Sequence, residues 1–230
     1  MTIIGENLER VRKRVAAACL AAGRDPSAVQ LLAVSKSVGA ELVAQAVAAG
    51  QTAFGENYIQ EALNKMALTP QLPIQWHCIG PIQSNKTRLV AENFAWVQSV
   101  DRLKIAQRLS EQRPAHLAPL QVCIQVNIDG GATKAGVMPK ETLDLAREIT
   151  ALPNLTLRGL MSIPEPAPDF ASACAVHRKT QALFFFLQQQ GLALDTLSMG
   201  MSDDLEAAIA AGSTLVRVGS AIFGARARKA

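Results

Sequence analysis

The sequence predicts an α/β fold: a single (β/α)₈ barrel of the TIM type with an extra helix at its N-terminus. Three observations lead to this prediction. The chain has 230 residues, of which 49% are hydrophobic, and this is enough for one large core. Short apolar segments alternate with helical patterns eight times, as a parallel sheet with helical crossovers requires. No linker rich in proline, glycine or serine divides the chain, so we expect one domain over residues 1–230.

The first predicted element is an amphipathic helix over residues 3–22. Its apolar side chains recur with helical spacing and are Ile4, Leu8, Val11, Val15, Cys19 and Leu20. Gly23 follows directly, at a position where the C-terminus of a helix favours glycine. This helix precedes the first strand and is therefore an addition to the strand–helix repeat.

The repeat itself supplies eight strand candidates. They are residues 31–36, 52–54, 75–79, 95–99, 120–127, 156–162, 196–199 and 215–219. Helices are predicted between them at residues 40–49, 56–66, 84–92, 102–113, 140–151, 170–190 and 204–211. Eight such units favour closure into a barrel, and the proline-rich stretch 164–170 is expected to be a loop. A doubly wound open sheet is the alternative, because strands as short as 52–54 give a weak signal.

The composition excludes several kinds of site. The four cysteines lie far apart and form no C-x-x-C pair: Cys19, Cys78, Cys123 and Cys174. This spacing argues against a zinc site and against a redox dithiol. We therefore expect reduced, mostly buried thiols and no bound metal.

Charge and hydropathy indicate a cytoplasmic protein that binds neither membranes nor nucleic acid. Charged residues interrupt the first 15 residues, and no apolar run approaches the roughly 20 residues that span a bilayer. The net charge is +4, and much of the excess lies in Arg10, Arg12, Lys13, Arg14 and the tail residues Arg226, Arg228 and Lys229. Only 4% of the residues are aromatic, so these positive charges more closely resemble a solvated face than a nucleic-acid site.

Lys36 stands out among the residues at the strand ends, where the functional residues of a parallel barrel gather. It follows the apolar residues 31–34, which would keep its amine against a dry wall and favour the neutral, nucleophilic form. A lysine in this environment can form a Schiff base. The alternative is a lysine that ends a strand and extends into water.

The seventh and eighth units add small residues directly after their strands. The segments are SMGMSDD (198–204) and RVGSAIFG (217–224). Glycine, serine and free N–H groups at helix N-termini form phosphate sites, which in barrels typically follow strands seven and eight. The glycines could instead only form turns. Neither segment matches a nucleotide-binding loop, so a nucleotide ligand is poorly supported.

Arg217, on the last strand, is expected to point a permanent positive charge into the top of the barrel. Together with a Schiff-base lysine and a phosphate cradle, this arrangement suggests pyridoxal 5′-phosphate, whose pyridine nitrogen needs a protein partner. An arginine partner leaves that nitrogen unprotonated and weakens the ring as an electron sink. The alternative role for Arg217 is a salt bridge to a carboxylate such as Asp203.

Six long segments carry a family resemblance: AVSK (33–36), FGENYIQE (54–61), WHCIGPIQSNK (76–86), RGLMSIP (158–164), SMGMSDDLEAAIAAGST (198–214) and VRVGSAIFG (216–224). Through them the chain resembles the pyridoxal phosphate homeostasis proteins, also called proline synthetase co-transcribed homologues, along essentially its whole length. The resemblance implies an alanine racemase-like barrel of fold type III. It also implies that the protein binds pyridoxal 5′-phosphate and passes it on, so that the free aldehyde stays low.

The resemblance also assigns roles to residues, none of them catalytic. Lys36 becomes the Schiff-base lysine and Arg217 the partner of the pyridine nitrogen. The implied phosphate ligands are Ser202, Gly219 and Ser220, with Met199, Gly200 and Met201 shaping the cradle. Asn57 and His77 are expected to line the ring.

A carrier is favoured over an enzyme because a racemase of the related two-domain type needs a second acid or base, usually a tyrosine from an added β-domain. The chain stops at Ala230 and its one tyrosine is Tyr58, within a barrel motif. We therefore expect a monomeric binding protein without robust activity, whose partners are enzymes lacking their cofactor. The alternatives are a small racemase or lyase, and an interaction module with a basic surface. Lys134 is either a second cofactor-receiving amine or a solvated loop lysine.

Overall fold

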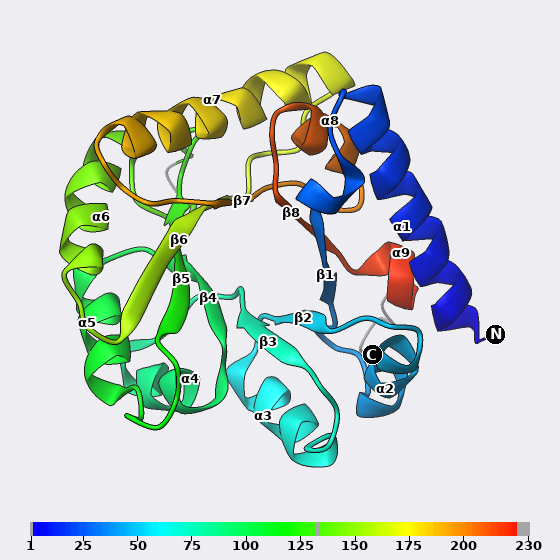
Figure 1. The fold of residues 1–230 in the computed structure, drawn as a ribbon, viewed down its shortest axis with the longest axis horizontal. Coiled ribbons are helices and arrows are strands. Elements are labelled where there is room, and N and C mark those ends of the chain that lie inside the picture. Colours follow the sequence, from blue (N-terminus) through cyan, green and yellow to red (C-terminus); the bar gives the residue numbers. More distant parts are fainter. Residues whose placement is uncertain (1, 132–133, 225–230) are drawn as a thin grey trace.

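Eight parallel strands close into a barrel in the order β1 to β8 in the computed structural model, which describes residues 2–131 and 134–224 (Figure 1). The strands are β1 Gln30–Val34, β2 Ala53–Glu56, β3 Gln75–Cys78, β4 Trp96–Val100, β5 Leu120–Val126, β6 Leu155–Ser162, β7 Thr196–Ser198 and β8 Leu215–Val218. β8 pairs with β1, with Arg217 opposite Leu32, and this pairing completes the ring. The predicted barrel is confirmed, and the open sheet is excluded.

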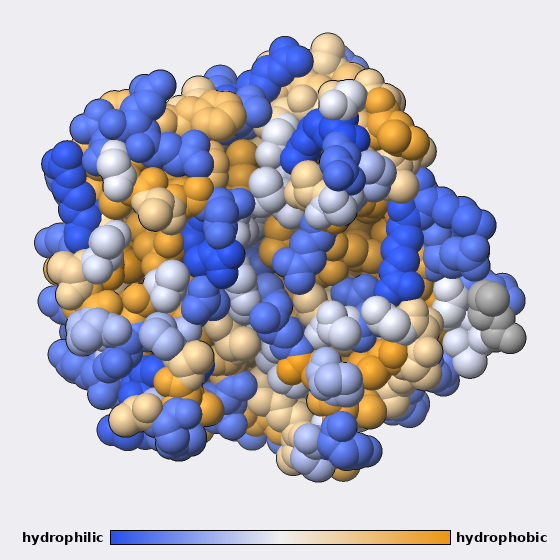
Figure 2. Space-filling model, in the orientation of Figure 1, coloured by the Kyte–Doolittle hydropathy of each residue, from blue (hydrophilic) through white to orange (hydrophobic). Residues whose placement is uncertain are grey.

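Helices surround the barrel on the outside (Figure 1). They are α1 Ile3–Ala21, α2 Ala40–Ala48, α3 Ile59–Leu68, α4 Thr87–Asn93, α5 Leu103–Gln112, α6 Thr142–Thr150, α7 Phe170–Gln189, α8 Leu205–Ala210 and α9 Ser220–Phe223. Short 3₁₀ turns occur at Pro26–Ala28, Ser84–Lys86 and Pro139–Glu141. In the same view, hydrophilic side chains are distributed all around the rim of the molecule (Figure 2). The apolar faces of the helices pack inward on the strands and form most of the core.

The predicted N-terminal helix is α1, and it packs against α2, α8 and α9. Thr2 caps it, because the Thr2 hydroxyl oxygen accepts a hydrogen bond from the N–H of Gly5 at 3.1 Å. Gly23 follows with φ of 67°, a left-handed conformation that glycine adopts at low cost. The amide of Asn7 donates to the carbonyl of Ile222 at 2.8 Å, so α1 braces the segment that follows β8.

The second strand extends further than its sequence predicts. Glu56 was expected to begin a helix, but it is the last residue of β2, paired with Cys78 of β3, and α3 begins at Ile59. The reason is tertiary, because the Glu56 carboxylate is buried against Lys65 and Ser35. A buried ion pair of this kind overrides the helical preference of a glutamate.

The cysteines are free thiols in the protein interior. All four side chains are buried, and none forms a disulfide. Burial raises the pKa of the Cys78 and Cys123 thiols to about 12, which leaves them unreactive at neutral pH.

Within residues 2–131 and 134–224, no group of three or more His, Cys, Asp or Glu side chains could hold a metal ion. None of the helices in this same part of the chain has the length and apolar character of a membrane span.

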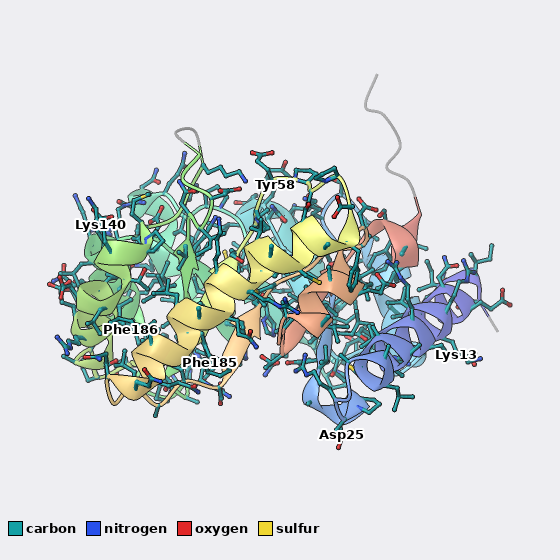
Figure 3. All side chains as sticks on the ribbon, turned by 90° about the horizontal axis from the view of Figure 1, so that it is seen from above. Lys13, Asp25, Tyr58, Lys140, Phe185 and Phe186 are labelled. Atoms are coloured by element: carbon teal, nitrogen blue, oxygen red, sulfur yellow. The ribbon has the colours of Figure 1, made fainter. Side chains whose placement is uncertain are left out.

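The two ends of the barrel are distinct (Figure 3). Asp25, which precedes β1, lies at one end together with Phe185 and Phe186 near the end of α7. Tyr58, which follows β2, lies at the opposite end, where the strands finish. The segments that follow the strands gather at this second end, and they carry most of the predicted site residues.

Candidate functional site

A cavity of about 430 Å³ opens at the C-terminal end of the strands. Its walls come from segments that follow β1, β2, β3, β6, β7 and β8. Seven of the ten predicted site residues line it: Lys36, Asn57, Met201, Ser202, Arg217, Gly219 and Ser220. These residues are far apart in the sequence, and the closed barrel brings them together.

Lys36 lies at the cavity wall two residues after β1 and is partly buried. The backbone before it still follows the sheet, because the N–H of Ser35 donates to the carbonyl of Gly55 at 3.1 Å. The apolar part of the wall includes Val34, which belongs to the apolar run predicted to lie against the Lys36 amine. The other apolar lining residues, to which the sequence did not point, are Val38, Leu42, Ile79, Ile163 and Phe223. The Lys36 amine thus belongs to a concave site of the kind that binds small ligands.

Arg217 of β8 contributes a buried guanidinium to the cavity and is only 4% exposed. Its Nη1 donates to the hydroxyl of Ser198 at 2.6 Å and its Nη2 to the carbonyl of Ser162 at 2.9 Å. Burial lowers the pKa of Arg217 to about 10, while the nearby Asp204 acts in the opposite direction, so the group stays protonated at neutral pH. No ion pair joins Arg217 to a carboxylate of the described chain, so the salt bridge to Asp203 is not formed.

The floor beneath Arg217 is a hydrogen-bonded network inside the barrel. The Ser198 hydroxyl donates to Gln98 Oε1 at 2.7 Å, and Gln98 Nε2 contacts His77 Nδ1 at 3.0 Å. His77 stacks on Trp96 with ring centroids 5.1 Å apart, and its Nε2 contacts Gln75 Oε1 at 3.1 Å. Burial lowers the pKa of His77 to about 3, so the imidazole is neutral.

His77 therefore differs from its prediction as a residue that lines the ring. The side chains of residues two apart on a strand point to the same side, so both His77 and Ile79 face the barrel interior. Ile79 is at the cavity and His77 is one layer deeper, fully buried. The link from His77 to the cavity is thus indirect, through Gln98, Ser198 and Arg217.

Two hydroxyl groups meet at the cavity, one from the loop after β7 and one from the first residue of α9. The Ser220 hydroxyl donates to the Ser202 hydroxyl oxygen at 3.3 Å. Gly219 lies between β8 and α9, and a Cβ there would lie 3.0 Å from the Val34 carbonyl oxygen. The loop after β7 is fixed by Asp204, whose carboxylate accepts from the Met201 N–H at 2.6 Å and from His177 Nε2 at 2.9 Å. These small residues lie where the sequence predicts a phosphate cradle, and their hydroxyls would suit a ligand that carries several acceptor oxygens.

Met199 and Gly200 lie beneath the cradle and do not line the cavity. Met199 is fully buried in the core, and the Gly200 carbonyl accepts from the Arg217 N–H at 3.0 Å. Gly200 has φ of 90°, and a Cβ there would lie 2.5 Å from the Cβ of Ala208. Their contribution is to shape the turn that carries Met201 and Ser202.

Gly200→Ala is expected to destabilise the protein by about 2–3 kcal/mol, because both the positive φ and the clash with α8 penalise a side chain. Gly191→Ala is the matched control, with φ of 87° and no atom within 4 Å of the added Cβ, so about 1 kcal/mol is expected there. Urea unfolding measures both values. Equal losses in the two variants would contradict a steric role for Gly200.

Asn57 follows β2 and lines the cavity. Its Oδ1 is buried and has no hydrogen-bond partner among the described residues. A buried oxygen without a donor is rare and is explained most simply by a ligand or water in the cavity. Gly80 packs against this residue, because a Cβ on Gly80 would collide with the backbone oxygen of Asn57.

Tyr58 and Lys134, for which the sequence left two roles open, offer no reactive group to the cavity. Tyr58 is 61% exposed and is not among the cavity-lining residues (Figure 3). Lys134 forms ion pairs with Asp129 at 2.7 Å and Glu165 at 3.2 Å. Burial lowers the pKa of Lys134, but the hydrogen bonds to these carboxylates outweigh burial and leave the pKa above its ordinary value. The amine is thus held as an ammonium ion rather than as the cofactor-receiving nucleophile considered above.

The residues of the cavity suit pyridoxal 5′-phosphate. Lys36 would offer an amine to the aldehyde, Arg217 a donor to the pyridine nitrogen, and Ser202 and Ser220 hydroxyls to the phosphate. The apolar wall and the buried Asn57 Oδ1, which accepts no hydrogen bond from the described residues, would suit a flat ring with polar substituents.

Comparison with known proteins gives the same result. The family described as "Alanine racemase, N-terminal domain" matches residues 6–227. The pyridoxal phosphate homeostasis protein of Pseudomonas aeruginosa is 58% identical over 226 residues, which cover 98% of this chain and 97% of that protein. The chain belongs to the pyridoxal phosphate homeostasis protein family. The resemblance seen in the sequence motifs is therefore confirmed.

Solved structures support the family fold. The PipY protein of Synechococcus elongatus, solved with pyridoxal phosphate bound, is 36% identical with a TM-score of 0.83, covering 96% of this chain and all (100%) of that chain. Alanine racemase from Corynebacterium glutamicum is 17% identical with a TM-score of 0.72, covering 97% of this chain but 61% of the racemase. The predicted alanine racemase-like barrel is thus confirmed, and the racemase contains further residues beyond it.

Proposed function

We propose that this protein binds pyridoxal 5′-phosphate as a Schiff base on Lys36 and holds it for transfer to other proteins, as part of pyridoxal phosphate homeostasis. The observation that carries the proposal is one cavity that combines the Lys36 amine, the buried Arg217 guanidinium and the paired hydroxyls of Ser202 and Ser220. When bound, the cofactor supplies an aldehyde that condenses reversibly with amines and a ring that can withdraw electrons.

The residues of the chain have separate tasks in this proposal. Ser202, Gly219 and Ser220 hold the phosphate through hydroxyl and backbone donors. Arg217 donates to the pyridine nitrogen and, with a pKa of about 10, gives that nitrogen no proton at pH 7. Val34, Leu42, Ile79 and Phe223 exclude water from the bound ring. This arrangement favours binding over strong stabilisation of a carbanion.

The lining residues also support a carrier over an enzyme. Among those that the structure describes, the ionisable side chains are Lys36, Asp203 and Arg217. Proton transfer on both faces of a substrate requires a second acid or base within hydrogen-bond reach. Asp203 is the one carboxylate among the described lining residues, so it is the group on which the second candidate function, a small amino-acid racemase or lyase, depends.

Spectroscopy and assays test both candidates. The purified protein with pyridoxal 5′-phosphate is expected to show the absorbance of a protonated Schiff base, and borohydride should fix the label on Lys36 in peptide maps. When the protein loaded with pyridoxal 5′-phosphate is mixed with an enzyme that lacks this cofactor, the activity of that enzyme should be restored. Racemisation or cleavage of amino acids at about 1 s⁻¹ or faster, typical of enzymes, would favour the second candidate. Gel filtration and cell fractionation test the expected monomer and its cytoplasmic location.

A further inference from the structure

A cluster of charged side chains lies behind Lys36, outside the cavity. It consists of Glu56 at the end of β2 and of Glu61 and Lys65 on α3. The Lys65 side chain is 5% exposed and the Glu56 side chain 1%. The Lys65 ammonium lies 2.7 Å from Glu56 Oε1 and 2.6 Å from Glu61 Oε1. No step proposed above uses these residues, so the burial of the Lys65 and Glu56 charges needs another explanation.

Stability alone does not readily explain this cluster. Taking charges out of water costs several kcal/mol per ion, so a buried ion pair often contributes no more stability than a pair of apolar side chains. Burial also raises the pKa of Glu56, against the opposing effect of the hydrogen bonds from Lys65 and Ser35. A second oxygen of Glu56, Oε2, is buried without a hydrogen-bond partner within the described residues. Burying these charges costs free energy. The hydrogen bonds between the cluster and the backbone suggest what the cluster does.

Those contacts converge on the two residues that flank Lys36. Lys65 Nζ donates to the carbonyl of Ser35 at 2.6 Å, and this bond completes its three donors. The Ser35 hydroxyl donates to Glu56 Oε1 at 2.6 Å. On the other side of Lys36, the N–H of Ser37 donates to Glu61 Oε1 at 2.6 Å. The peptide groups before and after Lys36 are therefore both tied to the same ammonium–carboxylate cluster.

Ser37 also has an unusual backbone conformation. Its φ is 61°, and among the described residues it is the one non-glycine with a positive φ. Such a conformation costs free energy and persists where the surroundings impose it. The hydrogen bond from Ser37 to Glu61, itself held by Lys65, supplies that constraint.

We propose that Lys65, together with Glu56 and Glu61, is a positioning residue that fixes the backbone of Ser35 and Ser37 and thereby aims the Lys36 amine into the cavity. Holding a nucleophile near its target replaces part of the entropy cost of bond formation. The Lys65 amine has no free donor and is not itself the nucleophile. This inference rests on the proposed Schiff base at Lys36, and it assigns a role to residues outside the cavity.

Lys65→Met tests the proposal, because methionine keeps much of the side-chain volume and removes the ammonium. Affinity is measured for pyridoxal 5′-phosphate and for pyridoxine 5′-phosphate, which has an alcohol in place of the aldehyde and forms no Schiff base. We expect about a tenfold loss for the aldehyde and less than about a twofold change for the alcohol. Stopped-flow absorbance should show slower formation of the Schiff base. An equal loss for both ligands, or no loss for either, would overturn the positioning role.

The matched control is Arg113→Met at the opposite end of the barrel. Arg113 also makes three hydrogen bonds, to the carbonyls of Ala91, Phe94 and Ala118, at distances of 2.6–2.8 Å. Its loss should lower the melting temperature without changing the ratio of the two affinities. A change in that ratio would show that destabilisation alone accounts for the result with Lys65→Met.

Two substitutions of Glu61, which is 30% exposed, test the proposal if Lys65→Met fails to fold. Glu61→Gln keeps an oxygen that can accept from Ser37, whereas Glu61→Ala removes it. We expect the loss of aldehyde affinity to be at least about threefold larger for alanine than for glutamine. Equal effects would contradict the proposal. If the wild-type protein forms no Schiff base on Lys36, the proposed function itself is wrong, and this result is distinct from any of the variants' outcomes.

Discussion

Lys36→Ala is expected to abolish the Schiff base and to weaken binding of pyridoxal 5′-phosphate by at least about a hundredfold, because the covalent bond contributes far more than one hydrogen bond. The variant keeps Arg217, Ser202 and Ser220, so pyridoxine 5′-phosphate should bind it with unchanged affinity. The measurements are titrations of both ligands and the absorbance spectrum with and without borohydride. Aldehyde and alcohol should bind the variant equally.

The matched control is Lys134→Ala, which removes another lysine at the same end of the barrel. The Lys134 amine is paired with Asp129 and Glu165 and donates to the carbonyl of Ile163 at 3.2 Å. Its loss should leave the Schiff base and the peptide map unchanged. If Lys36→Ala instead binds the aldehyde with undiminished affinity and the label maps to another lysine, the assignment of Lys36 as the tether is wrong.

The sequence predicts most of the fold because local patterns determine it. Each of the eight strands lies within two residues of its predicted bounds, since each is an apolar run followed by a helix. The error at Glu56 is informative. Its neighbours in the chain suggest a helix start, and only the ion pair with Lys65, nine residues on, and the contact with Ser35 explain why the residue belongs to a strand.

For the site residues, too, the sequence predicts some features and not others. Parallel strands all finish at one end of a barrel, so a sequence can predict that Lys36, Ser202 and Arg217 meet. It is harder to predict which side chains of a strand reach the cavity and which lie deeper in the barrel. His77 has the same parity as Ile79, and which of them reaches the cavity depends on barrel stagger and on neighbours such as Gln98 of β4. The Lys65 cluster gave no local signal, because a lysine on a helix usually faces water.

Arg217→Met is expected to weaken both pyridoxal 5′-phosphate and pyridoxine 5′-phosphate by about tenfold to a hundredfold. A hydrogen bond to a charged group contributes about 1.5–3 kcal/mol, which corresponds to this range. Both ligands carry the same pyridine ring, so both should lose the same contact. With pyridoxal 5′-phosphate, the Arg217→Met protein should also show a shifted absorbance maximum, since the proposed function has the guanidinium contact the ring in the wild-type protein. Titration and absorbance spectra measure these effects.

Stability must be separated from binding in this variant, because Ser198 and the Ser162 carbonyl lose a donor when Arg217 is removed. Arg158→Met is the control: Arg158 on β6 is partly buried, lies 4.9 Å from the Trp96 ring centroid, and pairs with Asp195. We expect it to lower stability in urea while leaving both affinities unchanged. If Arg217→Met weakens the aldehyde alone and leaves the alcohol unaffected, the guanidinium acts near the Schiff base rather than at the pyridine nitrogen. The orientation of the ring in the cavity would then be the reverse of the one proposed.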